Sequence, residues 1–361
     1  MSSQIGKNIK VTVFGESHGP AIGMVMDNPP AGLKLDFDYI SAQNKRRAPG
    51  NDKTATPRKE ADEPEFLSGV KNGVTTGAPI AVCIRNTNTK SSDYEALLNT
   101  PRPSHADYAA FVQSKGHNDV AGGGHFSGRL TAPIVTAGSI LRLYLKEKDI
   151  EIGGHILKIG TAEDERFDPI NIDADSLISL SKSNFALLNP KAEEKMRAEV
   201  ESARLEGDSI GGIVEIAVTG LPAGIGGPMF EGVENEIAKA VFGIPAVKGI
   251  EFGAGFEFAE MRGSQANDQM YYDGGKVLCS TNNNGGITGG LTNSMPIVFR
   301  VAIKPTPSIA KPQQTVDLKT GNNTEIIIHG RHDPCIVPRA LPAIEAATAI
   351  AIANLINEVN S

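Results

Sequence analysis

The chain has 361 residues, of which 40% are hydrophobic and 21% are charged, and its formal net charge is −7. This composition is typical of a soluble globular protein with a sizeable core, and an acidic chain without a basic stripe is not expected to bind nucleic acid. The three cysteines lie too far apart for a disulfide framework or a zinc spacing, which indicates a protein of the reducing cytoplasm.

The first predicted element is a strand over residues 11–14, followed by Gly15-Glu16-Ser17-His18-Gly19. These five residues match the G-x-S-x-G nucleophile elbow of serine hydrolases, which needs a helix directly after the turn. Residues 21–27 alternate with small and β-branched side chains and predict a second strand instead. We therefore expect a hairpin that carries Ser17 and His18 at its tip. A hydrolase built on Ser17 is the first alternative function.

The remaining elements follow from apolar periodicity, caps and turn residues. Strands are predicted at 79–84, 150–159, 213–218, 296–303 and 325–328, and helices at 36–47, 133–148, 191–205, 231–242 and 336–359. Pro133 is expected to be the first residue of its helix. The apolar stretch 340–356 contains Glu345 and is too short to span a bilayer comfortably, so we expect a buried helix and no membrane contact.

A weak internal repeat is visible in the order of the elements. A strand at 22–25 leads to Pro-Ala-Gly-Leu at 30–33 and then to a helix, and a strand at 210–214 leads to Pro-Ala-Gly-Ile at 222–225 and then to a helix. This order predicts two related α+β halves. No Pro/Ser-rich linker separates them, so we expect one domain over residues 1–361.

Six of the seven histidines lie in polar or glycine-rich segments. Histidine can give and take protons near neutral pH, so their grouping points to acid–base chemistry. Arginines and lysines accompany them, and the glycine-rich run 122–128 precedes a helix, which predicts a pocket for a phosphorylated anion. The spacings His117-x-Asp119 and His332-Asp333 are too loose for a metal site, and no metal is expected.

A series of segments resembles the chorismate synthase family over almost the full chain. Among them are F-G-E-S-H-G at 14–19, R-P-S-H-A-D-Y at 102–108 and G-R-H-D-P-C at 330–335. The other matching segments lie at 56–60, 67–70, 75–80, 207–212, 261–264, 284–290 and 304–308.

This chain departs from the family pattern at a few positions. The family's middle signature commonly reads G-G-G-R-x-S-A/G-R-E-T-A, and here His125 replaces its first arginine and Leu130 its glutamate. Ser104 stands at a glycine of the family, Ala48 at an arginine and Lys53 at a position often held by arginine. These changes put individual anion contacts in question, not the family.

The resemblance implies a lyase that converts 5-enolpyruvylshikimate 3-phosphate to chorismate and phosphate by a 1,4-trans elimination. Such enzymes require reduced FMN, although the reaction has no net redox change, and NADPH as its reductant is left open. The family fold is a β-α-β sandwich, with helices between antiparallel sheets, and it assembles as a homotetramer. A non-catalytic protein that binds FMN or a phospho-ligand is the second alternative.

The resemblance also implies roles for individual residues. His18 would give a proton to the leaving phosphate with Ser17 beside it, His105 would protonate or hold the reduced flavin, and Asp333 would help the flavin N5 take the ring proton. Segments matching those around FMN contain His125, Phe126, Ser127, Gly289, Lys304, Pro305, Thr306, Pro307, Ser308 and Arg331. The cations expected to bind substrate anions or the nicotinamide nucleotide are Arg46, Arg47, Lys53, Arg102 and Arg129.

Overall fold

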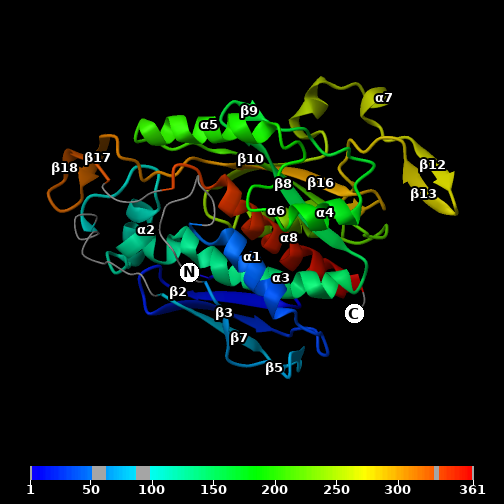
Figure 1. Cartoon of the computed structure of the whole chain (residues 1–361), viewed down its shortest axis with the longest axis horizontal. Helices are drawn as coiled ribbons and strands as arrows, with labels where there is room; N and C mark the ends of the chain where they lie inside the picture. Colours follow the sequence, from blue (N-terminus) through cyan, green and yellow to red (C-terminus); the bar gives the residue numbers. More distant parts are fainter. Residues whose placement is uncertain (1, 51–61, 87–97, 329–332, 360–361) are drawn as a thin grey trace.

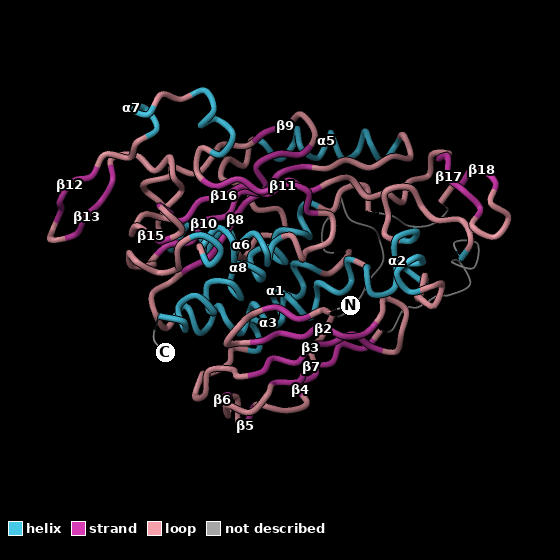
Figure 2. The backbone as a smooth tube through the Cα atoms, turned by 180° about the vertical axis from the view of Figure 1, so that it is seen from behind, coloured by secondary structure: helices cyan, strands magenta, loops and turns pink. Residues whose placement is uncertain are grey.

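The computed structural model describes residues 2–50, 62–86, 98–328 and 333–359. Two five-stranded antiparallel sheets enclose a layer of helices, an arrangement visible from both sides of the molecule (Figures 1 and 2). The first sheet has the order β1 (Gln4–Ile5), β2 (Lys10–Gly15), β3 (Ala21–Asp27), β7 (Ile80–Arg85), β4 (Glu65–Phe66). The second has the order β11 (Val247–Phe252), β16 (Ile297–Ile303), β10 (Gly212–Thr219), β8 (Glu151–Ile159), β9 (Ala162–Glu163). The predicted α+β class is confirmed.

The helices of the middle layer are α1 (Phe37–Arg47), α3 (Thr131–Lys146), α6 (Val233–Val241) and α8 (Val337–Val359). Gly138 of α3 lets the two long helices cross closely, because a Cβ there would lie 2.3 Å from the Cβ of Ala346 on α8. Helices α4 (Ala174–Leu180) and α5 (Ala192–Leu205) lie outside this layer. The short helices are α2 (Asp107–Ser114) and α7 (Gly263–Ala266), and the 3₁₀ turns beside the site are η2 (Ala121–Phe126) and η3 (Gly128–Leu130).

Small hairpins project from these layers. They are β5 (Val70–Lys71) with β6 (Val74–Thr75), β12 (Met270–Asp273) with β13 (Lys276–Cys279), β14 (Ile287–Thr288) with β15 (Leu291–Thr292), and β17 (Gln313–Asp317) with β18 (Asn322–Ile326).

Helix α8 is the centre of the core. By length and composition it could cross a membrane, but 94% of its most apolar window is buried inside the fold. Ala343, Ile344 and Ala347 are at most 2% exposed, as expected for a core helix enclosed by two sheets. The predicted buried helix is confirmed.

The two turns of the sequence repeat have the same hydrogen bonds. Thr75 accepts one N–H from the turn 30–33 on its carbonyl and another on its hydroxyl, both at 2.9 Å, and its hydroxyl donates to the Pro30 carbonyl at 2.6 Å. Thr292 makes the same three contacts with the turn 222–225, at 2.9, 3.0 and 2.6 Å.

Candidate active site

The Ser17–His18 segment forms the predicted hairpin tip. β2 and β3 pair antiparallel in register, and no helix follows the turn, so the structural context of a nucleophile elbow is missing. Ser17 is buried, with its N–H donating to the Gly124 carbonyl at 3.1 Å. The His18 Nδ1 lies 3.3 Å from the Ser17 hydroxyl.

The glycine run 122–124 brings His18 and His105 to one place. All three glycines have left-handed backbone, with φ of +60°, +87° and +54°, which costs residues with a side chain far more than glycine. A Cβ on Gly122 would lie 2.2 Å from the His18 ring, and one on Gly123 would lie 3.1 Å from Cε1 of His105. The two histidines therefore contact consecutive residues of the same loop.

His105 is held by an ion pair at the start of α2. Its Nδ1 lies 2.5 Å from Oδ1 of Asp107. Arg102 donates from Nε and Nη2 to the two oxygens of that carboxylate, at 2.7 and 2.9 Å. Burial alone would raise the pKa of Asp107, but the hydrogen bonds and charges of Arg102 and His105 outweigh it and hold the pKa far below its usual value.

The segment 304–308 joins this group to Asp333. The Lys304 ammonium donates to the Ser104 carbonyl at 2.6 Å, and Arg102 donates to the Ser308 hydroxyl at 3.2 Å. The hydroxyl of Thr306 donates to the Asp333 carbonyl at 2.8 Å. Burial, with the nearby charge of Lys248, lowers the pKa of Lys304.

Asp333 and Arg47 are connected through Arg339, whose guanidinium pairs with the Asp333 carboxylate and donates from Nε to the Arg47 carbonyl. The sequence places Arg339 next to a loop but carries no signal for this pairing. Asp333 lies directly after residues 329–332, which are outside the described part of the chain.

The Asp62 carboxylate forms ion pairs with two of the arginines predicted to bind substrate anions. Arg47 donates to one carboxylate oxygen at 2.6 Å, and Arg129 pairs with the other. Burial alone would raise the pKa of Asp62, but the two guanidinium groups outweigh it and lower the pKa below its usual value. Asn86 accepts from Nε of Arg129 at 2.8 Å and donates to the Glu16 and Gly19 carbonyls, at 3.1 and 2.7 Å. This Asp62 cluster is thereby attached to the His18 turn.

Arg46 lies elsewhere. Its guanidinium is 4% exposed and pairs with Glu345 of α8 at 2.7 Å, with further bonds to Gln43 and the Ser183 carbonyl. Arg142 of α3 contacts the same carboxylate at 3.3 Å. The structure thus separates Arg46 from the other predicted anion-binding residues and places it among the core helices.

Of the predicted flavin-binding residues 125–127, His125 has both of its ring nitrogens in contact with other residues of the chain. Its Nδ1 donates to the Gly15 carbonyl at 2.7 Å, and its Nε2 lies 2.5 Å from the Ser3 hydroxyl.

Ser127 accepts from the Arg129 N–H and lies beside Gly123. Phe126 is 37% exposed. Leu130, the other departure from the family signature, packs in a small apolar cluster with Ile22 and Ile84.

Gly289 is a predicted site residue that is not joined to this group. Gly289 lies in the turn between β14 and β15, and Figure 2 shows that hairpin at the opposite end of the molecule from α2. Lys53 and Arg331 lie outside the described residues.

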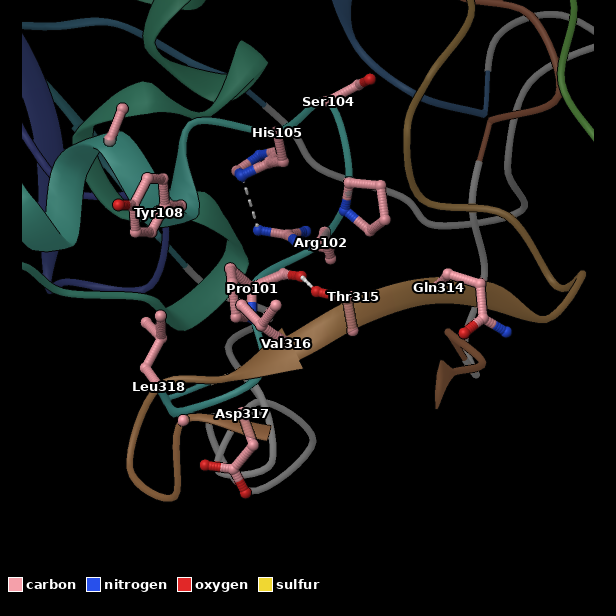
Figure 3. A pocket seen from close by; sticks show the side chains of 13 residues that line it. Pro101, Arg102, Ser104, His105, Tyr108, Gln314, Thr315, Val316, Asp317 and Leu318 are labelled. Carbon is pink, nitrogen blue, oxygen red and sulfur yellow. Dashed lines mark hydrogen bonds between the residues drawn. The ribbon is translucent and has the colours of Figure 1, made fainter. Parts of the chain in front are cut away.

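A cavity opens beside His105, between the segment 101–109 and the β17–β18 hairpin (Figure 3). Its volume is about 680 Å³, within the range of small-molecule sites. Figure 3 shows Arg102, His105 and Tyr108 on one wall and Thr315 and Val316 on the other. Within the described residues, no group of three or more His, Cys, Asp or Glu side chains could hold a metal ion.

A layered α+β fold whose loops gather histidines and paired guanidinium groups is typical of an enzyme for an anionic small molecule. Residues 9–356 match the family model described as chorismate synthase. The chorismate synthases of Thermococcus gammatolerans and Methanosarcina mazei are 47% and 46% identical over 354 and 351 residues. Those alignments cover 97% of this chain in both cases, and 96% and 94% of the relatives. A solved structure titled "Crystal Structure of Chorismate Synthase" is 28% identical, covers 98% of this chain and 93% of its own, and superposes with a TM-score of 0.76.

The chain belongs to the chorismate synthase family. The predicted activity is thereby confirmed: it is a lyase of the shikimate pathway that forms chorismate from 5-enolpyruvylshikimate 3-phosphate. The family's requirement for reduced FMN comes with this membership.

Several residues of the site were missed by sequence reasoning. Asp107 stands inside the R-P-S-H-A-D-Y segment, where its two-residue spacing from His105 was an available signal. Asp62 and Asn86 stand in no recognisable motif, and only the fold reveals that they face Arg129.

Proposed function

We propose that the β2–β3 tip, the glycine run 122–124 and the segment 102–107 form the active site of this lyase. The observation that carries the proposal is that the His18 and His105 rings contact two consecutive glycines, Gly122 and Gly123. A side chain on either glycine would clash with an imidazole. His18 donates a proton to the departing phosphate, which makes it a better leaving group. Ser17 orients the His18 ring from 3.3 Å.

The substrate's anionic groups need cations near these histidines. Arg47 and Arg129 stay in place through Asp62, and Lys304 reaches the loop that carries His105. Because the pKa of Lys304 is lowered partly by burial, its charge is poorly solvated and gains from an incoming phosphate or carboxylate. We assign these three cations to the substrate and cofactor anions, and we leave Arg46 out because its partners lie in the core.

The residues around His105 fit the reduced flavin. The glycine run provides close backbone approach and Lys304 provides charge. The cavity of about 680 Å³ lies next to them, since His105 lines it and also contacts Gly123. Ser127 and the segment 304–308 would hold FMN beside His105, which holds a proton at its ring nitrogen. When bound, the reduced flavin supplies the electron-rich ring on which the elimination depends. His125 and Gly289 are not assigned a contact.

Asp333 is proposed as the second proton-handling group. The Arg339 ion pair and the Thr306 hydroxyl hold its side chain and backbone. A carboxylate fixed in this way can accept a proton at a defined position. The family resemblance assigns it the ring proton.

Incubation of the protein with 5-enolpyruvylshikimate 3-phosphate and chemically reduced FMN, without oxygen, tests the activity. We expect chorismate and one phosphate for each substrate consumed, and no product with oxidised FMN. Flavin binding without turnover would favour the non-catalytic alternative. Labelling by a covalent serine probe, together with turnover that needs no flavin, would favour the Ser17 hydrolase.

NADPH as the flavin's reductant is a separate proposal. Oxidation of NADPH by the protein with FMN, followed at 340 nm without oxygen, would establish intrinsic reduction. Reaction only with an added reductase would place the reduction outside this chain.

A homotetramer in the cytoplasm is proposed from the family. The β12–β13 hairpin supports self-association, because Met270 and Tyr272 are 69% and 80% exposed, and Phe256 nearby in sequence is 86% exposed. Light scattering coupled to size exclusion measures the assembly. A monomer at micromolar concentration would contradict it.

We also propose that the single domain 1–361 contains two related halves. The strand orders β2-β3-β7-β4 and β8-β10-β16-β11 correspond along the chain, whereas the edge strands differ, since β1 precedes β2 and β9 follows β8. The matched contacts of Thr75 and Thr292 support the same pairing. Superposition of the halves in an experimental structure tests it.

A further inference from the structure

His105 and Asp107 form a short contact whose proton can be located by counting donors. Nδ1 of His105 lies 2.5 Å from Oδ1 of Asp107 and 3.1 Å from Nη2 of Arg102. Arginine cannot lose its proton in a protein and is a donor only. The low pKa of Asp107 makes its carboxylate an acceptor only.

Two arrangements of the imidazole can be compared. If Nδ1 carried no proton, its lone pair would face a carboxylate oxygen at 2.5 Å, which is repulsive. If Nδ1 carries the proton, it donates to Asp107, while Nη2 of Arg102 donates to the same oxygen at 2.9 Å. Only the second arrangement pairs each hydrogen-bond donor with an acceptor.

From this geometry we infer that Asp107 is a positioning residue that fixes the Nδ1–H tautomer of His105, leaving Nε2 as the nitrogen that exchanges protons in the reaction. Nε2 faces the glycine run 122–124, because a Cβ placed on Gly123 would lie 3.2 Å from it. The preceding residue of that run, Gly122, contacts the His18 ring of the β2–β3 turn. The inference deepens the proposed role of His105 and rests on it for its catalytic consequence.

Arg102 completes the arrangement from the other side of the carboxylate. Its backbone N–H and its Nε both donate to Oδ2 of Asp107, at 3.1 and 2.7 Å. Arg102 and Asp107 are 7% and 6% exposed. The carboxylate thus cannot rotate away from His105 without breaking buried bonds, so the tautomer is set by the fold rather than by solvent.

The substitution Asp107→Asn tests this inference with little change of shape. An amide has one oxygen, and Arg102 aims two donors at the Oδ2 position but only one, Nη2, at Oδ1, so the oxygen is retained at Oδ2. Nη2 can then donate to an unprotonated Nδ1 of His105, which lies 3.1 Å away. The amide NH₂ then faces Nδ1, and the imidazole must move its proton to Nε2. We expect two-bond ¹H–¹⁵N spectra of the histidine rings to show neutral His105 as Nδ1–H in the wild type and as Nε2–H in the variant.

The matched control is Asp175→Asn, since Asp175 is also an acidic residue in the first turn of a short helix but is exposed. It should leave the His105 signals and the turnover unchanged. Asp107→Asn should lower kcat about 10²-fold, the usual size of a general acid–base contribution, and it should add little to the loss caused by His105→Ala.

The spectra separate this inference from the wider proposal. An unchanged Nδ1–H tautomer in Asp107→Asn, or a wild type with the proton on Nε2, overturns the positioning role. Full activity of His105→Ala would remove the catalytic role of His105 from the proposed function, while a tautomer change in Asp107→Asn would still uphold the positioning by Asp107.

Discussion

Arg46 and Arg47 are neighbours on α1, yet their side chains belong to two different buried ion clusters. Arg46 joins Arg142 on the carboxylate of Glu345, within the layer of α1, α3 and α8. Arg47 joins Arg129 on the carboxylate of Asp62. Successive residues of a helix point about 100° apart, so one arginine faces the core and the next faces the loops of the site.

The two carboxylates have different surroundings. The Glu345 cluster links helices to one another, and the Glu345 side chain is 1% exposed. The Asp62 cluster is equally buried, but it joins the end of α1 and the turn η3 to the His18 turn, the last through Asn86. The two clusters therefore differ in the elements that they join and not in burial, and we propose that this difference separates a structural arginine from an arginine of the site.

The largest expected effect is on stability, from Glu345→Gln. The change leaves the guanidinium groups of Arg46 and Arg142 in the core without their shared carboxylate. Loss of one partner of a buried ion pair costs about 3–5 kcal/mol. We expect a fall of this size in the free energy of unfolding, measured by urea denaturation. A wild-type urea midpoint for Glu345→Gln would contradict the assignment of this cluster to the core.

Asp62→Asn should lower stability less than Glu345→Gln does, but it should lower turnover clearly. Asp62 itself lies outside any helix or strand, where local opening costs less free energy than in the core, so we expect a smaller stability loss of about 1–3 kcal/mol. Turnover should fall at least tenfold, because Arg47 and Arg129 lose the group that holds them. A folded Asp62→Asn variant with wild-type kcat and KM would show that the cluster does not support the site.

The pH dependence of stability gives a further distinction. The folded-state pKa of Asp62 is lowered from an unfolded value of about 3.9. Its contribution is thus fully present above that value and is lost as the pH falls through the folded-state pKa. The stability difference between wild type and Asp62→Asn should be constant from pH 7 to about 4 and shrink below it. A difference that disappears already near pH 6 would contradict this account.

The smallest expected effect comes from Asn86→Ala. The side chain joins Arg129 to two carbonyls of the His18 turn. Its loss should cost about 1 kcal/mol of stability and misplace His18 slightly, lowering kcat a few-fold with little change in KM. An effect on KM alone would instead place Asn86 at the substrate.

Local patterns predicted most of the fold. Asp36 was expected within the first helix and is its N-cap, accepting from the Tyr39 N–H at 2.9 Å. Pro133 was expected to start its helix, but α3 begins at Thr131 because a 3₁₀ turn precedes it. The strand expected at 325–328 is found at Asn322–Ile326, since its register is set by pairing with β17. The short helix α2 was missed.

The site was less accessible to sequence reasoning than the fold. Motifs indicated His18 and His105, and the fold brings them together. The different positions of Arg46 and Arg47 depend on how α1 faces α8, and the meeting of Asp62 with Arg129 depends on contacts between distant segments. No local pattern encodes those partners. His125 illustrates the same limit, because its partners Gly15 and Ser3 lie far away in the chain.

The most direct measurement of the central claim is chorismate formation by His18→Ala and His105→Ala with reduced FMN, without oxygen. His117→Ala is the matched control, since His117 is exposed and belongs to neither cluster. We expect both site variants to fold and to lose about 10²-fold or more in kcat, while His117→Ala retains wild-type turnover. Wild-type turnover by His18→Ala and His105→Ala would contradict the account.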